Sequence, residues 1–247
     1  MRRIRLTIAY DGTEFHGWQV QPGLATIQQH LEEIFADLEH KPVHVAGSGR
    51  TDAGVHALAQ IAAVSIQNPL PLYNLRKVLN RSLPPGIRIL ACEEVQPEFH
   101  PRFDATGKTY EYRIWRKEVL SPFEQRYLHH HPYPMSDEKF CSAARLFVGD
   151  HNFTAFAASD DRYAQSHNMV RRIYFSEATR EGGLLIYRVK GKGFLKHMVR
   201  NIAGTLIEAA KSNVSEDQIR WMLTAPRGVK AVPTAPAKGL FLIQVHY

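Results

Sequence analysis

The sequence predicts an α+β protein with two similar halves, each a mainly antiparallel sheet flanked by helices, around a central basic cleft. Short alternating apolar runs are separated by amphipathic helical stretches along the whole chain. The order strand, Gly-bearing loop, Phe, helix occurs twice, through Tyr10-Asp11-Gly12 to Phe15 and through Lys190-Gly191-Lys192-Gly193 to Phe194. Basic residues exceed acidic ones by seven. We expect the halves to span residues 1–105 and 106–247.

The first half begins with an alternating strand, expected over residues 3–10. A helix follows, with Thr26 and Gln29 as its capping box. One face of this helix is apolar and comprises Ile27, Leu31, Ile34, Phe35 and Leu38. The later elements of this half are strands at 43–46 and 58–66, a helix at 72–83 that ends before two prolines, and a strand at 87–94.

The second half begins with a strictly alternating strand over residues 108–115. Ser136 is expected to cap a helix that runs to Phe147, with acidic residues at its positive end. A shorter helix is expected to start at Ser215, which pairs with Gln218. The other elements are strands at 170–179, 184–190 and 240–246, and a helix from about 195 to 211.

Composition excludes several classes of protein. The chain has 247 residues, 31 Lys and Arg against 24 Asp and Glu, and a pI of about 9.4. This surplus favours a polyanionic partner, with nucleic acid ahead of an anionic membrane surface. Cys92 and Cys141 are the only cysteines, so a disulfide framework and a cysteine-based zinc site are not expected. No apolar run approaches the roughly 20 residues of a membrane span, so we expect a cytoplasmic protein without membrane contact.

The most informative segment is the loop at residues 47–56, Gly-Ser-Gly-Arg-Thr-Asp-Ala-Gly-Val-His, between two apolar runs. Its three glycines allow sharp turns, so the loop can present Arg50 beside Asp52. The guanidinium favours the ionised carboxylate and suits phosphate, a pairing that fits an enzyme acting on a polyanion. A plain turn is the alternative. A phosphate cradle fits poorly, because Asp52 stands where the third glycine of a dinucleotide motif would be.

Three further features have two interpretations each. Tyr110 and Tyr112 share one face of the 108–115 strand; Tyr112 suits the core, whereas Tyr110 could stack on a base. The basic run Lys190, Lys192, Lys196, His197 and Arg200 has positions 196, 197 and 200 on one face of a helix start, as either a phosphate site or a solvated face. The tract His129-His130-His131 lacks metal-ligand spacing, so a solvated loop is predicted.

At these residues the chain resembles the bacterial tRNA pseudouridine synthase A family over essentially its whole length. The Arg50-Thr51-Asp52-Ala53-Gly54-Val55-His56 run is the most specific match. The other matching segments are Tyr10-Asp11-Gly12 with Phe15-His16-Gly17-Trp18-Gln19, Lys108-Thr109-Tyr110-Glu111-Tyr112, Gly149-Asp150-His151-Asn152-Phe153, His197-Met198-Val199-Arg200-Asn201 and Ala235-Pro236-Ala237-Lys238-Gly239-Leu240.

The resemblance implies isomerisation of uridine to pseudouridine at positions 38, 39 and 40 in the anticodon stem-loop of tRNA. It implies the pseudouridine synthase fold, a homodimer, and no metal or other cofactor. The N1 glycosidic bond breaks, the uracil rotates, and it rejoins through C5. Such chemistry requires the nucleotide to be flipped out of its stack.

The resemblance also assigns roles to residues. Asp52 corresponds to the essential aspartate, either as nucleophile at C1′ or as base toward the ribose 2′ position. Tyr110 corresponds to the tyrosine that stacks on the substrate. Arg50 would help the base to leave its stack, and Arg200 resembles the arginine that pairs with the catalytic carboxylate. Lys192 and Lys196 are the candidate phosphate contacts.

Two rival interpretations belong to other classes. The chain could be a non-catalytic tRNA-binding module in which Asp52 is only a turn residue. It could also be a phosphate-dependent metal enzyme that uses Asp11, Asp52 and the histidine tract. Activity on uridine in tRNA in the presence of EDTA would separate all three.

Overall fold

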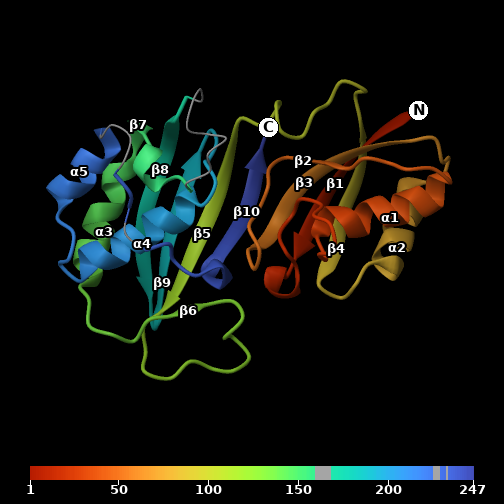
Figure 1. Ribbon diagram of the computed structural model, residues 1–247. Helices are drawn as coiled ribbons and strands as arrows, with labels where there is room; N and C mark the ends of the chain where they lie inside the picture. The colour runs from red at the N-terminus through yellow and green to blue at the C-terminus, as the bar shows by residue number, and fades with distance from the viewer. Residues whose placement is uncertain (159–167, 225–228, 232) are drawn as a thin grey trace. The chain divides into compact units, whose positions relative to one another are not determined.

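The computed structural model describes residues 1–158, 168–224, 229–231 and 233–247 (Figure 1). The chain forms two compact units, one of Met1–Thr106 with Phe241–Tyr247 and the other of Gly107–Leu240. The expected division at residue 106 placed the last strand with the second half. The structure assigns residues 241–247 to the first unit because β10 (Leu240–His246) pairs in parallel with β3 (His56–Ile66), with Phe241 opposite His56.

The sheet of the first unit is mainly antiparallel. Strand β1 (Arg2–Tyr10) lies between β4 (Ile87–Val95) and β3, antiparallel to both. The expected strand at 43–46 is reduced to β2 (Ala46–Gly47). The reason is that helix α1 (Ile27–Glu39) satisfies the Val45 backbone instead: the Glu32 carboxylate accepts from its N–H and the Gln28 amide donates to its carbonyl.

Two helices of this unit match the sequence pattern closely. Helix α1 starts after Thr26, whose hydroxyl accepts a hydrogen bond from the backbone N–H of Gln29. The Gln29 side chain donates to Glu33 instead of returning to Thr26, so only half of the predicted capping box forms. Helix α2 (Leu72–Ser82) buries Leu75 and Leu79 and ends before the two prolines, as predicted.

The sheet of the second unit has the order β5 (Gly107–Trp115), β9 (Leu184–Gly191), β8 (Val170–Glu181) and β7 (Gly149–Asn152), with antiparallel neighbours. Tyr110, Tyr112 and Ile114 of β5 are all buried, as the alternation predicts, but Glu111 of the opposite face is buried too, paired with Arg113 and Arg188. Strand β7 was not predicted, because Gly-Asp-His-Asn has no apolar alternation and becomes a strand only through pairing with β8.

The solvated loop predicted for the histidine tract is wrong for most of its residues. His129 and His130 form strand β6 (His129–His130), which pairs in parallel with the end of β5, and His131 is buried. Burial, followed by the nearby positive charges of His131, Lys238 and His130, lowers the pKa of His129 to about 4. The sequence could not show this, because the pairing partner lies about 15 residues earlier in the chain.

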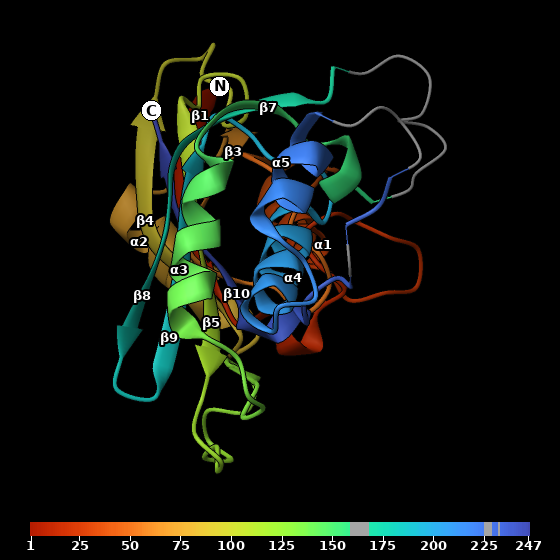
Figure 2. The ribbon, with the colours of Figure 1, turned by 90° about the vertical axis from the view of Figure 1, so that its left-hand side faces the viewer.

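Figure 2 shows the helices of the second unit, α3 (Asp137–Ala144), α4 (Met198–Ala210) and α5 (Glu216–Thr224), together on one side of its strands. Ser136 caps α3 and a 3₁₀ turn (Arg145–Phe147) continues it. Ser215 and Gln218 form the complete capping box expected for α5. Short 3₁₀ turns also occur at Gly12–Glu14, Thr154–Phe156 and Ala237–Gly239.

The start of α4 differs from the prediction. The helix begins at Met198, and His197 precedes it with a left-handed φ of 62°. Lys196 and His197 therefore lie outside the helix, and the expected helical face shared by residues 196, 197 and 200 does not form. Within the part of the chain that the structure describes, every helix is too short or too polar to cross a bilayer.

Candidate active site

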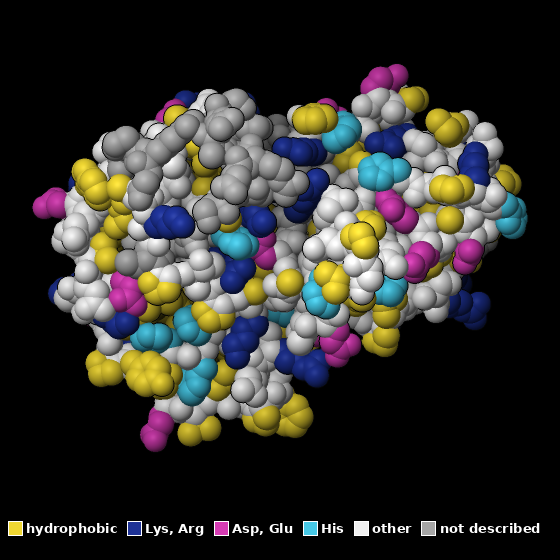
Figure 3. Space-filling view, viewed as in Figure 1, with side chains coloured by type: hydrophobic (Ala, Val, Ile, Leu, Met, Phe, Trp, Pro, Cys, Tyr) yellow, Lys and Arg dark blue, Asp and Glu magenta, His cyan; other side chains and the backbone are white. Residues whose placement is uncertain are grey.

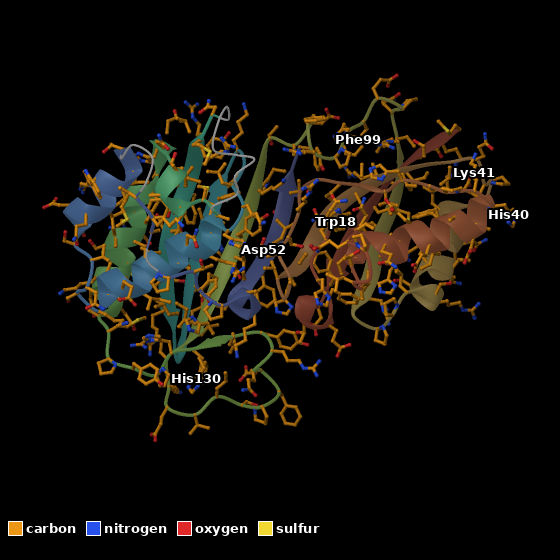
Figure 4. The ribbon with its side chains drawn as sticks, viewed as in Figure 1. Trp18, His40, Lys41, Asp52, Phe99 and His130 are labelled. Atoms are coloured by element: carbon orange, nitrogen blue, oxygen red, sulfur yellow. The ribbon has the colours of Figure 1, made fainter. Side chains whose placement is uncertain are left out.

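The loop that carries Asp52 connects β2 to β3 in the first unit (Figure 4). Asp52 is partly exposed, Arg50 is exposed and Thr51 between them is buried. The backbone carbonyl of Asp52 accepts a hydrogen bond from the N–H of Val55 across a turn that needs Gly54 at φ 75°. Asp52 and Arg50 thus project from a short loop whose intervening residue faces the core.

A buried hydrogen-bond network holds this loop. The hydroxyls of Tyr10 and Thr51 are 2.8 Å apart, and the Gln60 amide donates to the Gly49 carbonyl at 3.0 Å. The Ser48 hydroxyl donates to the Gln60 side-chain oxygen at 2.6 Å. Burial raises the pKa of Tyr10 to about 12, against the smaller effect of its hydrogen bonds to Thr51 and Gln60. Tyr10 therefore keeps its proton, and strands β1 and β3 both fix the loop.

Close backbone packing holds the same loop from outside. The backbone N–H of Trp18 donates to the Thr51 carbonyl at 3.1 Å, and the buried Trp18 indole fills the space above Gly47. A Cβ on Gly17 would lie 2.4 Å from the Thr51 oxygen, and one on Gly12 would lie 2.1 Å from the Val55 oxygen. Only glycine fits at these two positions, so the segment after β1 and the Asp52 loop are packed backbone against backbone.

His56, the last residue of the motif, is buried at the start of β3. Its ring stacks on Phe241 with centroids 4.7 Å apart. The backbone N–H of Gly12 donates to its Nδ1 at 3.0 Å. The Asp11 carboxylate also lies 3.2 Å from that nitrogen. His56 ties the segment after β1 to the end of the loop.

In the second unit, Tyr110 lies on β5 and is 8% exposed. The ring of Phe194 meets it edge to face, with centroids 5.1 Å apart. Phe194 belongs to the Gly-bearing loop after β9, so this loop determines which part of the Tyr110 ring stays accessible. Tyr112 is completely buried, as predicted, and its hydroxyl donates to the Pro236 carbonyl at 2.9 Å.

Arg200 lies in the first turn of α4 and is partly exposed. Its Nε donates to the Ala235 carbonyl at 2.9 Å, and the Ala235 N–H donates back to the Arg200 carbonyl at 3.1 Å. The segment before β10 is therefore fixed by Arg200 at Ala235 and by Tyr112 at Pro236.

Lys192 and Lys196 are both exposed in the loop between β9 and α4. The Lys192 N–H donates to the Arg172 carbonyl, and the Lys196 carbonyl accepts from the Ala158 N–H, so the backbone at each lysine is anchored. Figure 3 shows Lys and Arg side chains at several separate places on the visible face of this unit, among hydrophobic and His side chains.

The predicted site residues fall into two groups. Arg50 and Asp52 belong to one loop of the first unit, whereas Tyr110, Lys192, Lys196 and Arg200 belong to the second unit. Among the residues that the structure describes, no three His, Cys, Asp or Glu side chains gather in a way that could hold a metal ion.

Sequence reasoning missed Gln60 and Trp18 as residues that build the site. A usable signal exists for Gln60, because it is the polar residue inside the apolar run from Ala57 to Val64 and is completely buried. Trp18 has no such signal, since an indole in a Gly-rich loop could equally well face solvent.

Comparison with known proteins identifies the family. The family model described as tRNA pseudouridine synthase matches residues 6–104 and 143–247. This span includes the Asp52 loop, the segment after β1 that packs on it, and Arg200. The chain belongs to the tRNA pseudouridine synthase family.

Close relatives support the same assignment. The chain is 61% identical over its full length to the full-length tRNA pseudouridine synthase A of Solibacter usitatus. It is 42% identical to that of Pelobacter propionicus, with both chains covered completely, and 40% identical to that of Limosilactobacillus fermentum, covering 100% of this chain and 96% of the relative. The protein is therefore an isomerase that converts uridine to pseudouridine in tRNA.

Proposed function

We propose that the enzyme isomerises uridine to pseudouridine at positions 38, 39 and 40 in the anticodon stem-loop of tRNA, with Asp52 as the essential carboxylate. The observation that carries this proposal is the construction of the Asp52 loop. A partly exposed carboxylate stands on a segment held by the buried Tyr10, Thr51 and Gln60 side chains. Rigid support of an accessible reactive group is what a catalytic residue needs and a plain turn does not.

The reaction starts when the target nucleotide leaves its stack, with Arg50 supporting the extruded conformation. Asp52 then either attacks C1′ or removes the 2′ proton, and the N1–C1′ bond breaks. The freed uracil turns while Tyr110 holds it by stacking. C5 then bonds to C1′ as the Asp52–C1′ bond breaks or, in the other route, as Asp52 returns the proton to the 2′ carbon. Loss of the C5 proton and protonation of N1 complete the isomerisation, so atoms and charge balance without an oxidant, a reductant or a cofactor.

The remaining residues bind and orient the substrate in this proposal. Arg200 is the arginine proposed to pair with the catalytic carboxylate, and its hydrogen bond to Ala235 fixes its side chain. Lys192 and Lys196 contact phosphates, which fits their exposure. Two similar halves around a basic cleft, a homodimeric assembly and a cytoplasmic location complete the proposal.

The test uses tRNA transcribed with C5-tritiated uridine, incubated with enzyme in the presence of EDTA. We expect tritium release, and pseudouridine at positions 38, 39 and 40 when the product is mapped. Release that stops with EDTA would contradict the cofactor-free mechanism. Modification at other positions would contradict the assigned site in tRNA. Sedimentation of the pure enzyme tests the dimer separately.

A further inference from the structure

Helix α2 and the start of β4 carry a patch of basic and aromatic side chains at a distance in sequence from the Asp52 loop. We define the α2 patch as Tyr73, Arg76, Lys77, Arg81 and Arg88. Tyr73, Lys77 and Arg81 recur every fourth residue on the exposed side of the helix, opposite the buried Leu75 and Leu79. These three residues of the α2 patch form one stripe along the helix.

The orientation of this stripe is fixed. Asn80 clamps α2 to β4, since its amide donates to the Ile89 carbonyl and accepts from the Ile89 N–H, both at 2.8 Å. Arg76 donates to the Leu90 carbonyl at 3.1 Å, and Arg88 donates to the carbonyls of Pro84 and Ile87. The position of α2 on β4 and the side chains of Arg76 and Arg88 are therefore fixed before a ligand binds.

Among the residues that the structure describes, no acidic side chain pairs with a cation of the α2 patch. The sequence between Asp52 and Glu93 contains neither Asp nor Glu. Within the described part of the chain, none of the four cations pairs with a carboxylate, whereas Arg2 and Arg5 of β1 pair with Glu94 and Glu93. An ordinary solvated helix face mixes charges of both signs, so the composition of α2 points to an anionic partner.

Helix α1 of the same unit shows the contrast. It contains Glu32, Glu33, Asp37 and Glu39 but no Lys or Arg, whereas α2 contains three cations and no acid. A polyanion is repelled by the outer face of α1 and attracted to that of α2. The charges of the two helices are segregated, so α2 rather than α1 is the helix that attracts a polyanion.

Tyr73 favours RNA among the anionic partners. Its ring is 59% exposed, and the Lys77 ammonium lies 4.3 Å from the ring centroid. An exposed aromatic face beside cations can stack on a base or ribose while the cations contact phosphates. A membrane would require a broader apolar surface, and an acidic protein would not need the ring.

We propose that the α2 patch is an accessory RNA-binding surface that contacts the sugar-phosphate backbone of the tRNA substrate. This inference rests on the proposed function, because the tRNA it binds is the molecule that carries the reacting uridine. The α2 patch supplies affinity and takes no part in the bond changes, so its loss weakens binding but leaves turnover of bound tRNA unchanged.

The experiment measures affinity for an unmodified tRNA transcript at several salt concentrations. We expect Lys77→Gln and Arg81→Gln each to weaken binding by roughly 5- to 10-fold at 0.1 M salt and to reduce the slope of log K against log salt by about one. Gln preserves helix propensity, so the fold should be retained. Single-turnover rates at saturating enzyme should match wild type.

The matched control is Arg220→Gln, which also removes one exposed helical cation, but one that pairs with Glu216 at i,i+4. Its binding and salt slope should stay at wild-type values. Wild-type slopes in Lys77→Gln, Arg81→Gln and the double variant would overturn the proposal. The proposal would also be overturned if these variants lost binding to anionic phospholipid vesicles while their tRNA affinity stayed unchanged. Wild-type tritium release separates these outcomes from a failure of the proposed function, which would abolish release altogether.

Discussion

At the scale of single residues, the proposed mechanism depends on Asp52. Asp52→Asn removes the charge and the ability to attack or accept a proton, with almost no change in shape. We expect tritium release from C5-labelled tRNA to become undetectable, while tRNA affinity stays within a few fold of wild type. Asp37→Asn on the exposed side of α1 is the control and should keep full activity. Substantial release by Asp52→Asn would remove Asp52 from the catalytic role.

The second residue prediction concerns the hydroxyl of Tyr110. If the ring only stacks on uracil, Tyr110→Phe should keep binding and most of the turnover. If the hydroxyl also accepts or donates a proton, single-turnover rates should fall by roughly 10²–10⁴-fold with unchanged binding. We favour stacking with a smaller hydroxyl contribution, because Phe194 holds the ring edge to face.

Tyr110→Ala is the less informative variant at this position. The ring is almost completely buried, so removing it leaves a cavity that costs about 3–5 kcal/mol. Melting temperatures must therefore accompany its activity. Wild-type binding and rate in Tyr110→Ala would mean that Tyr110 is only a core residue and would contradict both versions of its role.

At the scale of elements, glycine determines how the segment after β1 packs on the Asp52 loop. Gly17→Ala puts a Cβ 2.4 Å from the Thr51 oxygen at a φ of 84°, so the loop must move. Gly23→Ala has a similar φ of 74° but no atom within 4 Å of its Cβ. Both variants share a backbone strain of about 1–2 kcal/mol. We expect only Gly17→Ala to lose turnover, measured as single-turnover rate. Equal losses in the two variants would contradict the packing argument.

His129 is partly buried where β6 pairs with β5, and this burial should make the stability of the fold sensitive to acid. The pKa of His129 falls from 6.5 to about 4 on folding, so below pH 6.5 the unfolded chain binds the proton first. Stability from this histidine is therefore complete above pH 6.5 and is lost progressively toward pH 4, by roughly 1–3 kcal/mol. Urea unfolding of wild type and His129→Asn across this range measures it. The variant should show a shallower decline; an identical decline would exclude His129 as its cause.

At the scale of the whole molecule, the net charge of +7 predicts salt-dependent association with tRNA. The slope of log K against log salt should be clearly negative, and smaller by about one phosphate contact in Lys192→Ala or Lys196→Ala. Lys211→Ala is the control, because Lys211 already pairs with Glu208 at 2.7 Å. A slope near zero for wild type would contradict electrostatic binding. Unchanged slopes in both variants would place the phosphate contacts on other residues.

Much of the local structure could be predicted because it depends on neighbouring residues. The caps at Thr26, Ser136 and Ser215 are formed by side chains within a few positions, and the strand at residues 240–246 follows from its own apolar pattern. The motif of the Asp52 loop is likewise a single unbroken run that includes Arg50 and Asp52. For these features the sequence contains both interacting partners close together.

The tertiary structure decided features whose partners are distant in the chain. The parallel pairing of β10 with β3 moved the last strand into the first unit, and β6 formed only because the end of β5 was available. The left-handed backbone of His197 delays the start of α4 to Met198, so Lys196 and His197 lie outside the helix. Gln60 became a support of the Asp52 loop through Gly49 and Tyr10, 11 and 50 residues away in sequence. Strand pairing and buried hydrogen bonds depend on groups brought together by the whole fold, so local pattern alone does not specify them.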